Sequence, residues 1–112
     1  MNFYDKVHEL VKNFKETEEY KKYIELKKKV KEDLTLKEKI DTFRNKQIDY
    51  QKQYINGTPM SESSKEEMQQ LYSVIIQSEL GAEFFQAEIR LNVLLADMQK
   101  IINDGMKDVI EF

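Results

Sequence analysis

The sequence contains no cysteine or tryptophan, a single histidine, one proline and three glycines. Without cysteine, the chain cannot form disulfides, thiolate nucleophiles or cysteine-bound metal and iron–sulfur sites of its own. Glycine and proline are too scarce among the 112 residues to support many turns, and the recurrent Lys, Glu, Leu, Ile and Gln favour helices. We therefore predict an all-α fold in a single domain, 1–112.

Long apolar runs are also missing. The longest is Val93–Ala96, far short of the roughly 20 apolar residues that a membrane-spanning helix needs. The opening residues, "MNFYDKVHEL", place Asp5, Lys6 and Glu9 where a signal peptide requires apolar side chains. These features predict a cytoplasmic protein with no membrane partner.

Catalytic and metal-binding patterns are absent as well. No glutamate lies three residues before His8, so the Glu-x-x-His pairs of a di-metal helical bundle cannot form. One histidine and no cysteine leave almost nothing for Ser–His or Cys–His catalysis, and the glycines stand too far apart for a phosphate-binding loop. We predict a non-enzymatic protein with no catalytic residues, metal or cofactor.

Apolar spacing predicts five helices, at about residues 3–15, 17–33, 35–55, 63–77 and 79–110. The helices over 35–55 and 79–110 are long, and we expect all five to form an antiparallel bundle. The predicted N-caps of the last four helices are Thr17, Thr35, Ser63 or Ser64, and Ser78. Thr35 precedes Glu38 by three residues, and the two serines precede Glu66 and Glu67 likewise, which is the capping-box spacing.

The segment "INGTPMSESS" is the one clear loop. Gly57 suits the left-handed end of a helix, and Pro59 cannot continue one. Net charge changes at the same place: residues 1–58 hold 14 Lys and Arg against 11 Asp and Glu, whereas residues 59–112 hold 4 against 10. We interpret this asymmetry as charge that is neutralised when the two halves pack, with a polar docking surface as the alternative.

The helix over 79–110 has two apolar faces. Its main apolar arc is centred on Leu91, Leu95, Met98 and Ile102, whereas Phe85, Ile89, Val93 and Ala96 form a second face, too far round the helix to meet the same partner. A small domain rarely leaves so much apolar surface in water. We therefore expect the second face to be the interface of a homodimer.

Polar residues interrupt the apolar faces of both long helices. Glu88 and Asn92 lie at the edge of the main arc, and Gln47 lies on the apolar seam of the helix over 35–55. If these helices pack together, we expect a polar layer drawn from Arg44, Gln47, Glu88, Arg90 and Asn92. Such a layer fixes register and partner choice at a cost in stability. In the alternative interpretation, Glu88 and Arg90 lie at the rim and face solvent.

A basic stretch, "KKKVK", supplies the candidate basic face Lys27, Lys28, Lys29 and Lys31. Glu25 lies four residues before Lys29, and Lys28 four before Glu32, which is the spacing of ordinary ion pairs on an exposed helix. We favour a solvated helix face, and keep RNA contact as the alternative. Nothing in the sequence indicates DNA binding.

Three segments carry a family resemblance: "NFYDKVHEL", "FRNKQIDYQKQYINGTP" and "EFFQAEIRLNVLLADMQKII". In combination they resemble the YlbF/YmcA/YheA family of small helical bacterial proteins, nearest its YheA-like branch. The specific features are Phe43-Arg44-x-x-Gln47, then Gly57, then Ala87-Glu88-x-Arg90. The resemblance covers nearly the whole chain and implies a fold of five helices that self-associates.

The resemblance also implies a function. Members of the YlbF and YmcA type act with a third protein on the mRNA-processing ribonuclease of Gram-positive bacteria, and so affect sporulation, competence and biofilm formation. By resemblance, this chain is a regulator or adaptor that binds itself, other family members or an RNA-processing complex. The alternatives are an RNA-binding module and a protein that acts only through self-association. The iron–sulfur clusters attributed to the three-protein complex depend on cysteines, which this chain lacks.

Overall fold

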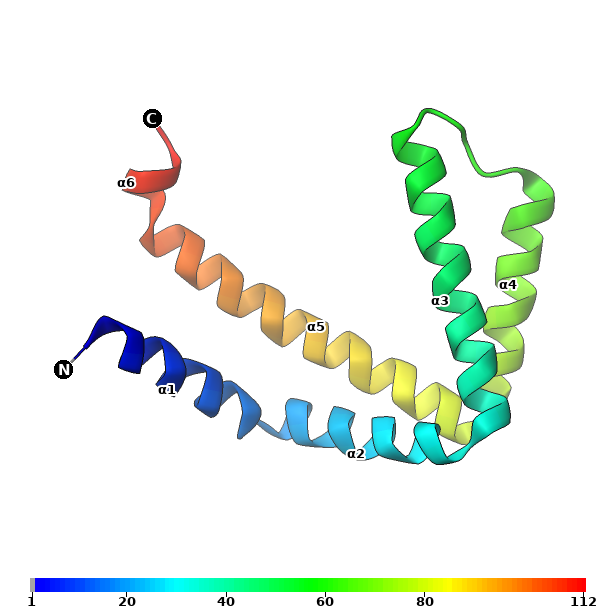
Figure 1. Cartoon of the computed structure of the whole chain (residues 1–112), viewed down its shortest axis with the longest axis horizontal. Coiled ribbons are helices and arrows are strands. Elements are labelled where there is room, and N and C mark those ends of the chain that lie inside the picture. Colours follow the sequence, from blue (N-terminus) through cyan, green and yellow to red (C-terminus); the bar gives the residue numbers. More distant parts are fainter. Residues whose placement is uncertain (1) are drawn as a thin grey trace. The chain divides into compact units, whose positions relative to one another are not determined.

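The computed structural model describes residues 2–112, and α-helices dominate this part of the chain (Figure 1). The helices are α1 (Phe3–Lys15), α2 (Glu18–Glu32), α3 (Leu34–Ile55), α4 (Glu62–Gln77), α5 (Glu79–Gly105) and α6 (Lys107–Ile110). The predicted all-α class is confirmed. The described residues form six helices where five were expected, because the chain leaves helical geometry at Met106, with φ −111° and ψ 18°.

The chain divides into two compact units. Unit 1 contains the residues up to Glu25 together with Gln86–Phe112, and unit 2 is Leu26–Phe85. Both boundaries fall inside continuous helices, α2 and α5, so each of these helices contributes to both units. That the whole chain behaves as a single domain stays a prediction.

Several helix ends follow the predicted capping. Thr17 Oγ1 accepts a hydrogen bond from the Tyr20 backbone N–H at 3.3 Å, and Ser78 Oγ accepts one from the Gly81 N–H at 3.2 Å. Gly57 has a φ of +83°, the left-handed conformation expected of it after the end of α3. These three positions were correctly assigned because each depends only on residues within one turn of it.

The predicted cap at Thr35 is wrong. The helix begins one residue earlier, at Leu34, and Asp33 is its N-cap, with the carboxylate accepting a hydrogen bond from the Leu36 N–H at 3.1 Å. A carboxylate at this position bonds the free N–H group and also interacts favourably with the positive end of the helix dipole. Thr35 consequently lies in the first turn of α3.

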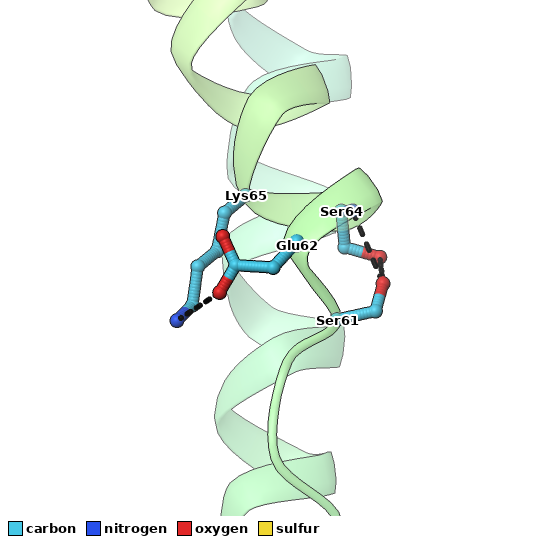
Figure 2. A network of polar contacts seen from close by, with 4 residues as sticks. All are labelled: Ser61, Glu62, Ser64 and Lys65. Atoms are coloured by element: carbon cyan, nitrogen blue, oxygen red, sulfur yellow. Dashed lines mark hydrogen bonds and ion pairs between the residues drawn. The ribbon is translucent and has the colours of Figure 1, made fainter.

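The start of α4 also differs from the prediction. Ser61, rather than Ser63 or Ser64, is the N-cap, and its Oγ accepts a hydrogen bond from the Ser64 N–H at 3.1 Å. Figure 2 shows the two serine hydroxyls in contact and the ion pair between Glu62 and Lys65, whose Oε1 and Nζ lie 3.4 Å apart. Capping at Ser61 places Glu62 in the first turn, where a negative charge is favourable.

The core of unit 2 lies where α3 and α4 pack side by side (Figure 1). Phe43, Tyr72 and Phe85 form an aromatic cluster in which the Tyr72 and Phe85 rings stack at 5.6 Å between centroids. The buried apolar side chains of this unit are Leu26, Val30, Leu36, Ile40, Ile75, Phe84 and Phe85. Gly81 permits a close approach at the α4–α5 turn, because a Cβ there would collide with the carbonyl oxygen of Ile75.

Unit 1 has a much smaller core. Ala87 is its one buried residue within the described chain. Phe14 of α1 contacts Tyr20 of α2 edge-to-face at 5.9 Å, which ties the first two helices together. No helix formed by residues 2–112 combines the length and the apolar character needed to cross a membrane.

Candidate interaction surfaces

The exposed face of α5 contains three of the four expected interface residues. Ile89 and Val93 are 59% and 56% exposed, and Ala96 is exposed as well. Their i, i+4, i+7 spacing puts all three on one side of the helix. We call this set the α5 face. Two large aliphatic side chains therefore meet water there, and their burial by a partner stays a prediction.

Phe85 does not belong to the α5 face. Only 8% of its surface is exposed, because its ring is enclosed by Phe43 of α3 and Tyr72 of α4 within unit 2. The interface expected from helical periodicity is corrected at this residue. Phe85 lies on the same side of α5 as Ile89, but α3 and α4 cover that side as far along as Phe85.

A hollow of about 400 Å³ borders the α5 face in unit 1. It is lined by Glu19, Ile89, Arg90, Val93, Leu94 and Asp97. The guanidinium of Arg90 and two carboxylates thus surround an apolar centre. An arrangement of apolar centre and polar rim is typical of protein–protein interfaces.

A second hollow, of about 380 Å³, lies between α1 and α5, and we call it the α1–α5 groove. Its lining is almost entirely apolar: Leu10, Phe14, Leu94, Met98, Ile101 and Ile102, with Asn13, Thr17 and Asp97 as the polar members. Leu94 and Asp97 also line the hollow beside the α5 face. The two hollows therefore adjoin each other along α5.

A third hollow, of about 500 Å³, lies in unit 2 at the loop end of α3 and α4. Gln47, Tyr50, Gln51, Tyr54, Ile55, Met60 and Met68 line it, and none of them carries a formal charge at neutral pH. This hollow was not predicted from the sequence. Its sequence signal is the apolar and aromatic residues at the end of α3, Tyr50, Tyr54 and Ile55, followed by Met60 in the loop. Helical periodicity does not group a loop residue with residues of a helix.

The residues of the expected polar layer fall in different units. In unit 2, Arg44 lies over the Phe84 ring, with its Cζ 5.5 Å from the ring centroid, a cation–π geometry. Gln47 lines the unit 2 hollow. Glu88, which is half-buried, and the exposed Arg90 and Asn92 belong to unit 1. The polar layer stays a prediction.

The orientation of the basic face follows from two buried residues of the same helix, α2. Leu26 and Val30 are buried, and on a helix this turns the residues between and beyond them toward solvent. Lys27, Lys28, Lys29 and Lys31 are accordingly all exposed. Four exposed ammonium groups are therefore grouped on a single helix, and their binding to RNA stays a prediction.

An ion pair links α3 and α4 in unit 2. Lys46 Nζ of α3 lies 2.6 Å from Glu67 Oε1 of α4. The hydrogen bond that the Lys46 ammonium donates to the Glu67 carboxylate raises the pKa of Lys46 above its ordinary value. Within residues 2–112, no group of three or more His, Asp or Glu side chains is arranged to hold a metal ion.

Comparison with known proteins gives a consistent result. A family model described as "Control of competence regulator ComK, YlbF/YmcA" matches residues 3–107. The chain is 33% identical over 108 residues to a UPF0342 protein of Shouchella clausii, covering 96% of this chain and 92% of the relative. It is 32% identical over 108 residues to one of Alkalihalophilus pseudofirmus, with the same coverage, and 33% identical over 107 residues to one of Halothermothrix orenii, covering 96% and 91%. None of these three names describes an enzyme, and the assignment to the YheA-like branch stays a prediction.

Proposed function

We propose a regulatory, non-enzymatic function, from the premise that this chain belongs to the YlbF/YmcA family, which is described as controlling the competence regulator ComK. In this proposal the protein is an adaptor that docks through its helical faces onto itself and onto other proteins. Its partners are other family members or an RNA-processing complex, and its effects extend to sporulation, competence and biofilm formation. These finer points follow from the resemblance of the sequence to the family.

The observation that carries the proposal is the exposed α5 face. Ile89 and Val93 leave more than half of their surface in water, beside the charged side chains of Arg90 and Asp97. Burying such aliphatic groups supplies the driving force for association, and the flanking charges supply specificity. The polar layer of Arg44, Gln47, Glu88, Arg90 and Asn92 would then fix the register of the long helices and of the partner.

Genetic complementation tests the regulatory function. The gene is deleted in the source bacterium and replaced by the wild type, by Ile89→Asp or by Gln70→Asp, an exposed α4 position that serves as the matched control. We expect the deletion to change the transcript levels of competence genes, and the wild type and Gln70→Asp to restore them. Ile89→Asp should fail to do so although the protein accumulates. Unchanged transcripts in the deletion strain would refute the regulatory proposal.

Multi-angle light scattering tests the homodimer separately. Because the α5 face is apolar at its centre, the wild type should be dimeric at both 50 mM and 500 mM salt, and Ile89→Asp should be monomeric. A wild type that is monomeric at both salt concentrations would exclude self-association through this face.

RNA binding is the second candidate, and the outward orientation of the four lysines of the basic face favours it. If all four contact phosphates of a single strand, the logarithm of the affinity should fall with the logarithm of salt concentration with a slope of roughly −3. The assay is fluorescence anisotropy with a labelled single-stranded RNA, using Lys27→Glu/Lys28→Glu against wild type. A flat salt dependence, or equal affinity of the variant, would remove RNA from the candidates.

A further inference from the structure

The two units differ in how much of their apolar surface they bury. Unit 2 encloses seven apolar side chains, whereas unit 1 encloses only Ala87 among its described residues. Yet α1 is strongly amphipathic: Phe3, Val7, Leu10 and Phe14 recur at the spacing of one helical face. A set of helices with so small a core gains little from burial by itself. Unit 1 therefore leaves apolar surface that a partner can cover.

The exposed surface has the size of a standard interface. On α1 and near the C-terminal end of α5, seven apolar side chains remain at least 40% exposed: Phe3, Tyr4, Val7, Leu10, Val11, Ile101 and Ile102. At those exposures they offer roughly 500 Å² of apolar surface, taking the areas typical of aromatic and aliphatic side chains. A standard interface buries about 800 Å² on each partner, of which about 60% is apolar, or roughly 500 Å². The two areas agree.

The shape of this surface points to a second copy of the same chain. The α1–α5 groove offers a concave apolar lining. The exposed side chains Phe3, Tyr4 and Val11, which we call the outer stripe of α1, offer a convex apolar surface, with Phe3 at 73% and Tyr4 at 68% exposure. In two copies, the convex stripe of each can therefore cover the concave groove of the other, as in an isologous two-fold pair. The charges also match, because Lys12 and Lys15 in the last turn of α1 are opposite in sign to Asp97 at the groove.

We propose that α1 of a second copy lies in the α1–α5 groove, in a two-fold pair where each groove receives the other subunit's α1. The inference rests on the self-association proposed above and assigns the helix that completes the interface. Leu94 and Asp97 line both the groove and the hollow beside the α5 face, so the inserted helix extends the Ile89 and Val93 contact along α5. Each subunit thereby supplies the core that unit 1 of its partner lacks.

Light scattering over a dilution series tests the assignment with three variants. Val11→Asp charges the outer stripe of α1, Ile89→Asp charges the α5 face, and Gln70→Asp on α4 is the control. Because an aspartate must be desolvated in the pair, Val11→Asp should raise the dissociation constant by about 100-fold or more, while Gln70→Asp leaves it unchanged. Circular dichroism at 222 nm confirms that each variant stays helical.

A second measurement does not depend on a disruptive substitution. The chain has no cysteine, so Val7→Cys and the control Gln70→Cys each carry one thiol. A short bis-maleimide should join two copies of Val7→Cys, since the proposed pair brings the two α1 helices together, and should leave Gln70→Cys unjoined.

The outcomes separate the two proposals. Suppose that Ile89→Asp dissociates the dimer, whereas Val11→Asp leaves the dissociation constant unchanged and the bis-maleimide does not join Val7→Cys copies. This result would overturn the α1 assignment and leave the α5-face homodimer standing. A wild type monomeric at every concentration would overturn both. A monomer whose α1 binds anionic phospholipid vesicles would likewise overturn the inference, because the stripe would then cover a membrane surface.

Discussion

Replacing Gly81 with alanine should destabilise the protein, although alanine is the better helix former. The added Cβ would lie far inside the van der Waals contact distance to the Ile75 carbonyl oxygen, 3.1 Å from the carbonyl carbon and 3.2 Å from Cγ2 of the same residue. Two of these three atoms belong to the backbone, so a rotamer change cannot relieve the contact. The end of α4 and the start of α5 must instead move apart.

The expected cost follows from what that movement disturbs. Overpacking at a buried site costs about 1–3 kcal/mol. The Ile75 carbonyl also accepts the Ser78 N–H at 3.2 Å, and weakening this hydrogen bond adds up to about 1 kcal/mol. The higher helix propensity of alanine offsets at most about 1 kcal/mol of this cost. The net loss is about 2 kcal/mol, or about 6–12 °C in Tm for a chain of this length.

Thermal unfolding followed by circular dichroism at 222 nm measures this loss. Gly105→Ala is the matched control, since Gly105 also lies in α5 and a Cβ there meets nothing within 4 Å. The control should leave Tm unchanged or slightly raised. If Gly81→Ala were as stable as Gly105→Ala, the close approach between α4 and α5 would be refuted.

Three further predictions concern unit 2. Asp33→Ala should cost about 1 kcal/mol in urea unfolding because a helix cap is lost, whereas Thr35→Ala should be nearly neutral; the reverse order would restore the cap predicted from the sequence. Phe85→Ala should cost about 3–5 kcal/mol by the same assay, since it opens the aromatic cluster, and a cost under 1 kcal/mol would place Phe85 on the surface. Glu67→Gln should lower the pKa of Lys46 toward its ordinary value, measured by NMR titration of the Lys46 side chain; an unchanged pKa would show that the ion pair does not form in solution. The stability that this ion pair contributes should be present below the ordinary lysine pKa and disappear as pH rises through the raised pKa of Lys46.

The local features of this protein were largely determined by its sequence. The all-α class, the break near Asp33, the caps at Thr17 and Ser78 and the left-handed Gly57 all depend on neighbours within one or two turns. Interactions at that range leave a pattern of spacing and residue type that can be read directly. At the start of α3, the capping-box spacing indicated Thr35, whereas the structure has Asp33 as the N-cap.

Only the tertiary structure decided how the helical faces are used. Ile89 and Phe85 lie on the same side of one helix, yet the first is mostly exposed and the second is enclosed by α3 and α4. The need for glycine at position 81 comes from the geometry of the α4–α5 turn, which brings the Ile75 carbonyl against it. Periodicity determines which side of a helix is apolar, but burial depends on which element covers that side, and that is a property of contacts between residues distant in the sequence.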